Sequence, residues 1–146
     1  MDTPTAPPKT AETAPEAAEE QRVRELEFDV FARACPSRPV LEHLTGRWGV
    51  LVLAGLHHGP ARFNALRRRV DGVSEKMLAQ TLQALERDGF VHREVRAVMP
   101  PRVEYSLTEL GRTTAAKLID LIEHLEAHMP AVLAAQQRHD RERDGD

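Results

Sequence analysis

The apolar residues of this chain change their spacing at Gly89, and this change restricts the fold more than any other feature. Before Gly89 they recur at the three- and four-residue intervals of a helix. After it they alternate with polar residues on both sides of Met99-Pro100-Pro101. Period two around a proline turn predicts a β-hairpin over 91–96 and 102–107, with the prolines in the loop because they cannot join a central ladder. The fold class is therefore α+β and mostly helical.

Two helices are expected directly before the hairpin. A short one covers Arg62–Val70 and is followed by the tight turn Asp71-Gly72-Val73. Ser74 is a good cap for the next helix, which runs to Asp88 and ends at Gly89. A short helix, a glycine turn, a capped helix and a hairpin, in that order, make a helix-turn-helix followed by a wing.

The segments before this core are a tail and two helices. Residues 1–21 are rich in proline, alanine and glutamate and are predicted to be disordered. A helix is plausible over Val23–Ala34. Ser37 caps the next helix with Pro39 in its first turn, and this helix continues to the terminator at 57–60.

One long helix is expected after the hairpin. Thr108 caps it, Pro130 interrupts it, and a further helical piece extends to about His139. Residues 140–146 form a charged tail that we expect to fray. The length suits one domain over 22–139 between two tails.

The charge of the chain is unevenly distributed. The formal net charge is −3, yet residues 38–107 hold eleven basic and seven acidic side chains, and both ends are acidic. A phosphate backbone responds to local potential more than to the total charge. A single cysteine, no apolar leader and no long apolar stretch predict a cytoplasmic protein with no membrane contact.

The second helix of the motif has a polar face suited to DNA. On a helical wheel Leu82 and Leu85 fall within about 40° of Leu78, so these leucines pack inward. Gln can bond adenine in a bidentate way, and Lys can reach guanine or a phosphate. An ordinary solvated helix face is the plainer interpretation. The side chains on this polar face are Lys76, Gln80 and Gln83.

Basic residues on both neighbouring elements favour the DNA interpretation over a plain solvated face. Arg62 and Arg67-Arg68-Arg69 lie on the first helix, and Arg93, Arg96 and Arg102 lie on the hairpin. The alternative is that some of these arginines serve only as ion-pair partners of Asp71 or Glu94 and do not contact DNA. We expect Ser74 to cap the recognition helix and donate to a phosphate. The residues expected to hold the DNA backbone are Arg62, Arg67, Arg68, Arg96 and Arg102.

The stretch from Cys35 to about Met129 resembles the HxlR-type winged helix-turn-helix regulators of bacteria. Arg47 departs from the lysine that is usual before this tryptophan, and Val95-Arg96 replaces a tyrosine that is common on the first wing strand. The matching residues are Cys35-Pro36, Gly46-Arg47-Trp48, Gly59–Leu66, Gly72–Gln80, Leu85–Val91 and Pro100–Gly111.

The resemblance implies a homodimer with the N- and C-terminal helices at the interface, bound to a pseudo-palindromic operator in double-stranded DNA. The apolar stripes on 23–30 and 118–129 agree, because they exceed what one small domain can cover. The resemblance also implies that Cys35 senses oxidants or electrophiles. A thiol just ahead of a helix is favoured as a reactive thiolate. The plainer interpretation is an inert buried cysteine.

Other interpretations have less support in the sequence. His124 and His128 are four residues apart with Asp120 one turn earlier, but no cysteine or tight His/Asp pair completes a metal shell, so no metal or cofactor is expected. Trp48 would be a core residue more readily than the wall of a small-ligand pocket. A winged helix that binds only protein remains open. An enzyme is not expected, because no serine lies at a nucleophile elbow and no glycine-rich phosphate loop is present.

Overall fold

The computed structural model describes residues 16–19 and 28–145, except for the side chains of Ala97 and Val98. Residues 16–19 form one helical turn, and the rest of the tail predicted to be disordered lies outside the described residues. The described chain divides into two parts, one ending at Glu42 and the other starting at His43, and each is described by itself.

In the first part, the helix predicted over Val23–Ala34 is not found where it can be assessed. Residues 20–27 lie outside the described chain, and 28–36 form successive turns. The Asp29 carboxylate accepts the N–H of Phe31 at 3.0 Å, and the Asp29 carbonyl accepts that of Ala32. An aspartate that bonds the local backbone in this way competes with helix formation. Helix α2 (Ser37–Thr45) then begins at the predicted cap residue.

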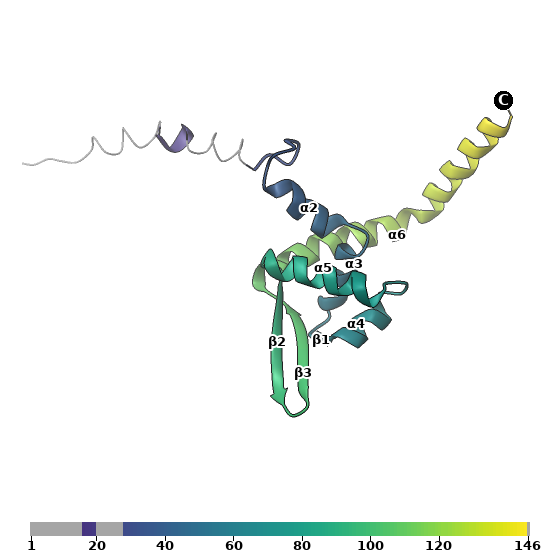
Figure 1. Cartoon of the computed structure of the whole chain (residues 1–146). Coiled ribbons are helices and arrows are strands. Elements are labelled where there is room, and N and C mark those ends of the chain that lie inside the picture. The colour runs from purple at the N-terminus through teal and green to yellow at the C-terminus, as the bar shows by residue number, and fades with distance from the viewer. Residues whose placement is uncertain (1–15, 20–27, 146) are drawn as a thin grey trace, which may run out of the picture. The chain divides into compact units, whose positions relative to one another are not determined.

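The second part contains the predicted winged helix (Figure 1). It closely follows the expected order of elements, and the hairpin projects away from the helices (Figure 1). The elements are α3 (Gly49–Leu56), β1 (Ala61–Arg62), α4 (Phe63–Arg69), α5 (Glu75–Arg87), β2 (Val91–Val98), β3 (Pro101–Leu107) and α6 (Glu109–Asp144).

The single helix predicted from Ser37 to His57 is wrong, because the chain breaks at Gly46–Trp48 into α2 and α3. The turn is tight: a Cβ at Gly49 would overlap the backbone oxygen of His43. Trp48 beside this turn is half-buried rather than fully enclosed, and the Arg47 guanidinium lies 4.6 Å from the centre of its ring.

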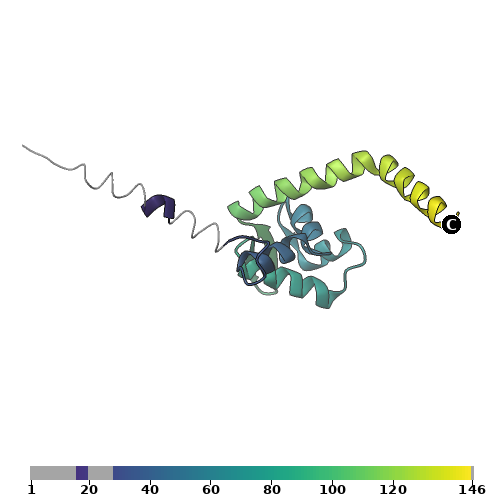
Figure 2. The ribbon, with the colours of Figure 1, turned by 90° about the horizontal axis from the view of Figure 1, so that it is seen from above.

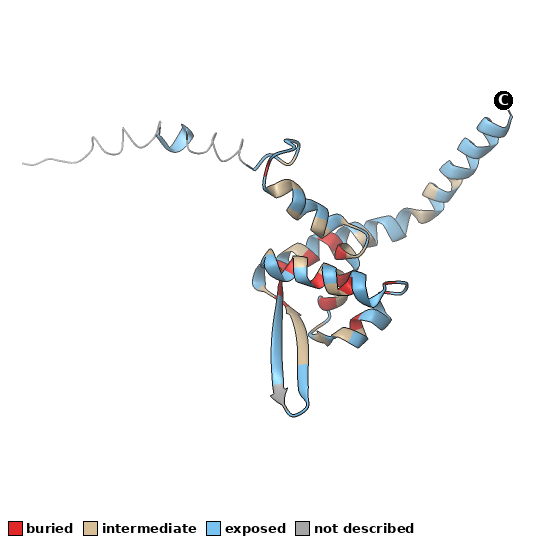
Figure 3. Ribbon diagram, in the orientation of Figure 1, coloured by how far each residue is buried: buried red, intermediate tan, exposed pale blue. Residues whose placement is uncertain are grey.

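The core lies where α3, α5 and α6 meet, and in the described residues it contains no buried polar side chain (Figure 3). Leucine dominates it, as the low aromatic content requires. The start of α6 packs closely, because a Cβ at Gly111 would overlap the Phe90 carbonyl. The fully enclosed side chains are Val52, Leu53, Leu56, Leu66, Leu78, Leu82 and Leu85.

The sheet has a third strand that was not predicted. Its order is β1-β3-β2, all antiparallel, with Ala61 opposite Tyr105 and Arg62 opposite Glu104. Arg62 therefore lies in β1, one residue before α4, and not inside the helix. Pro101 also differs from the prediction, since it is the first residue of β3, a position at which proline is tolerated.

Helix α6 is longer than predicted. It passes through Pro130 without interruption and continues beyond His139 to Asp144. Proline removes one backbone N–H and tends to kink a helix rather than always end it. The helix bends along its length accordingly (Figure 2). Thr108 caps it as predicted, its Oγ1 accepting the N–H of Gly111 at 3.0 Å. Among the described helices, none has the length and apolar character needed to cross a membrane.

Candidate nucleic-acid interface

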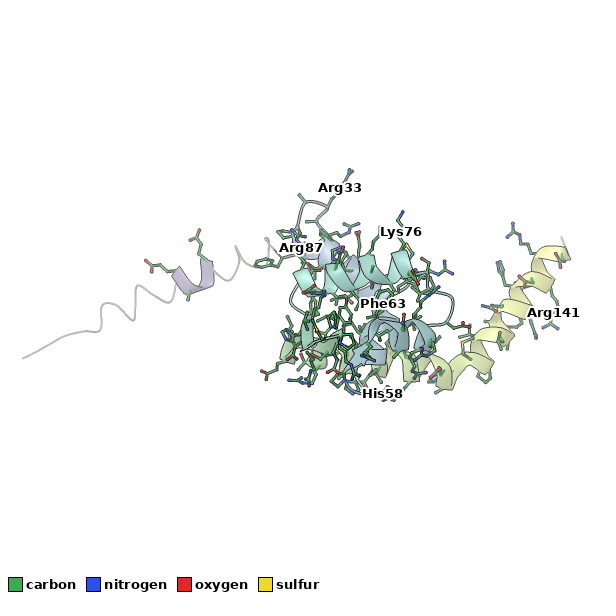
Figure 4. The ribbon with its side chains drawn as sticks, turned by 60° about the horizontal axis from the view of Figure 1, so that its bottom comes forward. Arg33, His58, Phe63, Lys76, Arg87 and Arg141 are labelled. Carbon is green, nitrogen blue, oxygen red and sulfur yellow. The ribbon has the colours of Figure 1, made fainter. Side chains whose placement is uncertain are left out.

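Helix α5 has the predicted two faces. Leu78, Leu82 and Leu85 are buried on one side. On the other side Lys76, Gln80 and Gln83 are all exposed, and Figure 4 shows Lys76 pointing away from the body of the domain. The Ser74 cap is also confirmed: its Oγ accepts the N–H of Met77 at 3.1 Å, which leaves the hydroxyl proton available to another acceptor.

Three of the predicted arginines line one hollow, which we call the arginine groove. Arg62 comes from β1, Arg68 from α4 and Arg102 from β3. The hollow measures about 480 Å³, and Phe63, labelled in Figure 4, forms part of its wall. Within the described chain no ion pair engages any of the three guanidinium groups. The groove is therefore a concave site of uncompensated positive charge.

The other two predicted arginines are exposed but already paired. Arg67 lies 2.9 Å from the Glu75 carboxylate at the start of α5. Arg96 contacts both Glu94 at 3.4 Å and Glu104 at 3.3 Å, beside a shift in the register of β2 and β3. The carboxylates partly compensate the charge of these two arginines, which weakens their attraction for a phosphate. We therefore expect each to contribute less than an arginine of the groove.

A second hollow, of about 360 Å³, lies between α5 and the hairpin. Arg93 and Tyr105 face each other across the two strands, and Gln83 and Glu86 approach from α5. Sequence reasoning placed Arg93 on the hairpin without assigning it a role, and it missed Tyr105. The signal was their spacing, because Arg93 lies two residues after the buried Val91 and Tyr105 two residues before the buried Leu107, so period two places all four on one face of the sheet.

Cys35 is buried, with 5% of its surface exposed. Its Sγ lies 3.0 Å from the Oγ of Ser37, the first residue of α2. The predicted location just ahead of a helix is confirmed, and the thiol has to become accessible before it can react with a solute.

The two histidines on α6 lie side by side, with ring centres 4.4 Å apart and ring planes inclined by 38°. His128 Nδ1 lies 2.7 Å from the His124 carbonyl oxygen, so this nitrogen donates to the backbone. In the part of the chain that the structure describes, no group of three or more metal-ligating side chains comes together.

Residues 43–132 match the model of the HxlR-like helix-turn-helix family. The chain belongs to this family. It is 54% identical over 110 residues to the HTH-type transcriptional regulator YtfH of Escherichia coli K12, covering 75% of this chain and 87% of that regulator.

Two solved structures extend the likeness. The ytfH protein from Salmonella typhimurium superposes with a TM-score of 0.70 at 55% identity, covering 73% of this chain and 96% of that one. The redox regulator HypR in its reduced form gives a TM-score of 0.62 at 36% identity, covering 68% and 98%. The resemblance inferred from the sequence and the winged helix-turn-helix class are both confirmed. This HxlR-like protein is a DNA-binding transcriptional regulator.

Proposed function

We propose that this HxlR-like protein acts as a homodimer on a pseudo-palindromic operator, with α5 in the major groove and the hairpin along the backbone. The observation that carries the proposal is the exposed amide and ammonium face of α5 on the same domain as the uncompensated arginine groove. A two-fold dimer presents two such helices to half-sites about 34 Å apart.

Each polar side chain has a role that follows from its chemistry. Gln80 and Gln83 offer amides for base edges, and Lys76 offers an ammonium for guanine or a phosphate. Ser74 directs its free hydroxyl proton to a phosphate at the start of α5. The five arginines, Arg62, Arg67, Arg68, Arg96 and Arg102, bind the backbone and fix the register without reading bases.

The proposal is tested by selecting genomic fragments with the purified protein and measuring their retention on filters at two salt concentrations. A regulator enriches particular sequences and releases DNA steeply as salt rises. Retention of no DNA at low salt would instead favour a winged helix that binds only protein.

We expect Gln80→Ala to relax sequence preference. The exposed amide is lost without disturbing the buried leucines, so one base contact disappears, which is worth about 1–3 kcal/mol of discrimination. Selection from a random duplex library should then show reduced enrichment at one position of each half-site. Gln137→Ala on α6, also exposed, is the matched control and should leave the selected sequence unchanged. If the Gln80 variant selects the same sequence as the wild type, the base-reading role is wrong.

The thiol response forms a second part of the proposal. HypR, a structural relative, is a redox regulator solved in reduced and oxidised forms. Cys35 is the single cysteine of this chain. Three products are therefore possible, namely a disulfide with Cys35 of the second copy, a mixed disulfide with a small thiol, or an electrophile adduct. In each disulfide two thiols lose two hydrogen atoms to an oxidant such as diamide.

We expect diamide to change the affinity of the wild-type protein for its selected DNA by about tenfold, a usual size for coupling between two sites. Cys35→Ser should bind DNA as the untreated wild type does and show no response. Fluorescence anisotropy gives the affinity, and mass spectrometry under non-reducing conditions identifies the product. An equal diamide effect in the serine variant would exclude Cys35 as the sensor.

A further inference from the structure

Several directed hydrogen bonds fix the C-terminal end of α5. Gly89 adopts a φ of +88°, which allows the N–H of Phe90 to reach the Leu85 carbonyl at 2.9 Å. The N–H of Gly89 bonds the Glu86 carbonyl at 3.1 Å, which completes a Schellman cap. Thr108, at the start of α6, donates its hydroxyl to the Gly89 carbonyl at 2.7 Å. This end of the helix is therefore anchored to its surroundings.

One more contact at this end joins residues far apart in the sequence. The Oδ2 atom of Asp88, the C-cap residue of α5, lies 2.6 Å from Nδ1 of His43 in the last turn of α2. The Asp88 side chain is only 9% exposed. A carboxylate at a helix C-terminus faces the negative end of the helix dipole, and a nearly buried one needs a donor. Capping of α5 alone does not explain an aspartate here, whereas the imidazole N–H of His43 does.

The pair lies at one end of α5, the proposed recognition helix, so a small change of angle there displaces the other end. Helix α5 has thirteen residues and is therefore about 19 Å long. A tilt of about 10° at Asp88 would move the opposite end by roughly 3 Å on that length. Hydrogen bonds to base edges tolerate much smaller errors than this. Lys76 and Gln80 lie toward that opposite end, whereas phosphate contacts made by long arginines adapt more easily.

We propose that the His43–Asp88 pair is a positioning contact that sets the angle of α5 and thereby sequence-specific DNA affinity. The inference rests on the proposed function, since it assumes that α5 reads bases. It assigns neither residue to the DNA surface. The pair should therefore affect binding to the selected sequence and leave non-specific binding unchanged.

The test compares two affinities for each variant. The probes are the duplex most enriched by the wild-type protein in a random-library selection and a scrambled duplex of the same length, both measured by fluorescence anisotropy. We expect His43→Ala to weaken binding to the enriched duplex by about tenfold, the size of losing one base-pair contact, with the scrambled duplex within about twofold. His43→Asn places an amide nitrogen near the position of Nδ1 and should restore most of the specific affinity.

Two further variants separate positioning from stability. Combining Asp88→Ala with His43→Ala should cost no more than either substitution alone, because both remove the same contact. His57→Ala removes an exposed imidazole at the end of α3 and should change neither affinity. The inference is overturned if the ratio of specific to non-specific affinity in His43→Ala equals that of the wild type. Should both affinities fall by the same factor, the role of the pair is purely structural. If the wild-type protein enriches no duplex, the proposed function itself fails.

Discussion

Replacing Leu121 and Leu125 together by glutamate should yield a monomer that has lost at least about 100-fold of its operator affinity. These leucines lie one turn apart on α6 and are 58% and 49% exposed in the single chain. Leu133, further along the same helix, is also exposed. Exposed apolar side chains that repeat along one helix indicate that another protein surface packs against them. A second copy provides it in the proposed dimer, and buried carboxylates would prevent its association.

The loss of DNA affinity follows from the loss of the second half-site. In a dimer the second recognition helix binds at a high effective concentration, which a monomer does not have. Sedimentation equilibrium should give a mass near 16.4 kDa for the variant and twice that for the wild type. Ala116→Glu with Ala127→Glu adds the same charge at exposed positions of α6 away from these leucines and should remain dimeric. A wild-type protein that sediments as a monomer would refute the dimer, and a dimeric leucine variant would place the interface elsewhere.

Local sequence signals predicted α5 and the hairpin well because each depends on contacts within a few residues. The Ser74 and Thr108 caps bond backbone groups three residues ahead, and Gly89 supplies the left-handed conformation that ends α5. The spacing of the leucines on α5 fixed which face is buried, and so placed Lys76, Gln80 and Gln83 outside correctly.

Features that depend on distant contacts could not be predicted. The break between α2 and α3 depends on how closely Gly49 approaches the His43 carbonyl. Strand β1 has two residues, too few for a periodic pattern, and exists because β3 pairs with it. The continuation of α6 through Pro130 was missed for a different reason, because proline can kink a helix without ending it.

In the candidate site, too, local features could be predicted from the sequence and features that depend on distant contacts could not. Composition identified the basic residues around the motif, and their exposure could be inferred from periodicity. Which arginines are compensated could not, because Arg67 and Arg96 find their carboxylates on other elements of the fold. The His43–Asp88 contact spans 45 residues and has no sequence signature. Partner choice among charged side chains is therefore the information that only the fold supplies.

The arginine groove should contribute strongly to DNA binding, because carboxylates of the described residues do not compensate its three guanidinium groups. We expect the triple variant Arg62→Ala, Arg68→Ala and Arg102→Ala to lose about 100-fold or more in DNA affinity at physiological salt. Each uncompensated guanidinium that neutralises a phosphate adds about one to the slope of log affinity against log salt. Because a dimer carries six of these arginines, the slope should become shallower by about five for this variant, for selected and scrambled duplexes alike.

Matched variants separate the groove from the net charge of the protein. Arg138, Arg141 and Arg143 are exposed near the end of α6, and replacing all three by alanine removes the same charge. That variant should keep the wild-type slope, because screening limits the reach of exposed charges to about 8 Å at physiological salt. Arg67→Ala with Arg96→Ala should have an intermediate effect, since the carboxylates of Glu75, Glu94 and Glu104 already compensate part of the charge of these two arginines. If both triple variants flatten the slope equally, DNA responds only to overall charge, and if the groove variant keeps the wild-type slope, its arginines do not contact phosphates; either result would leave the groove without a specific role.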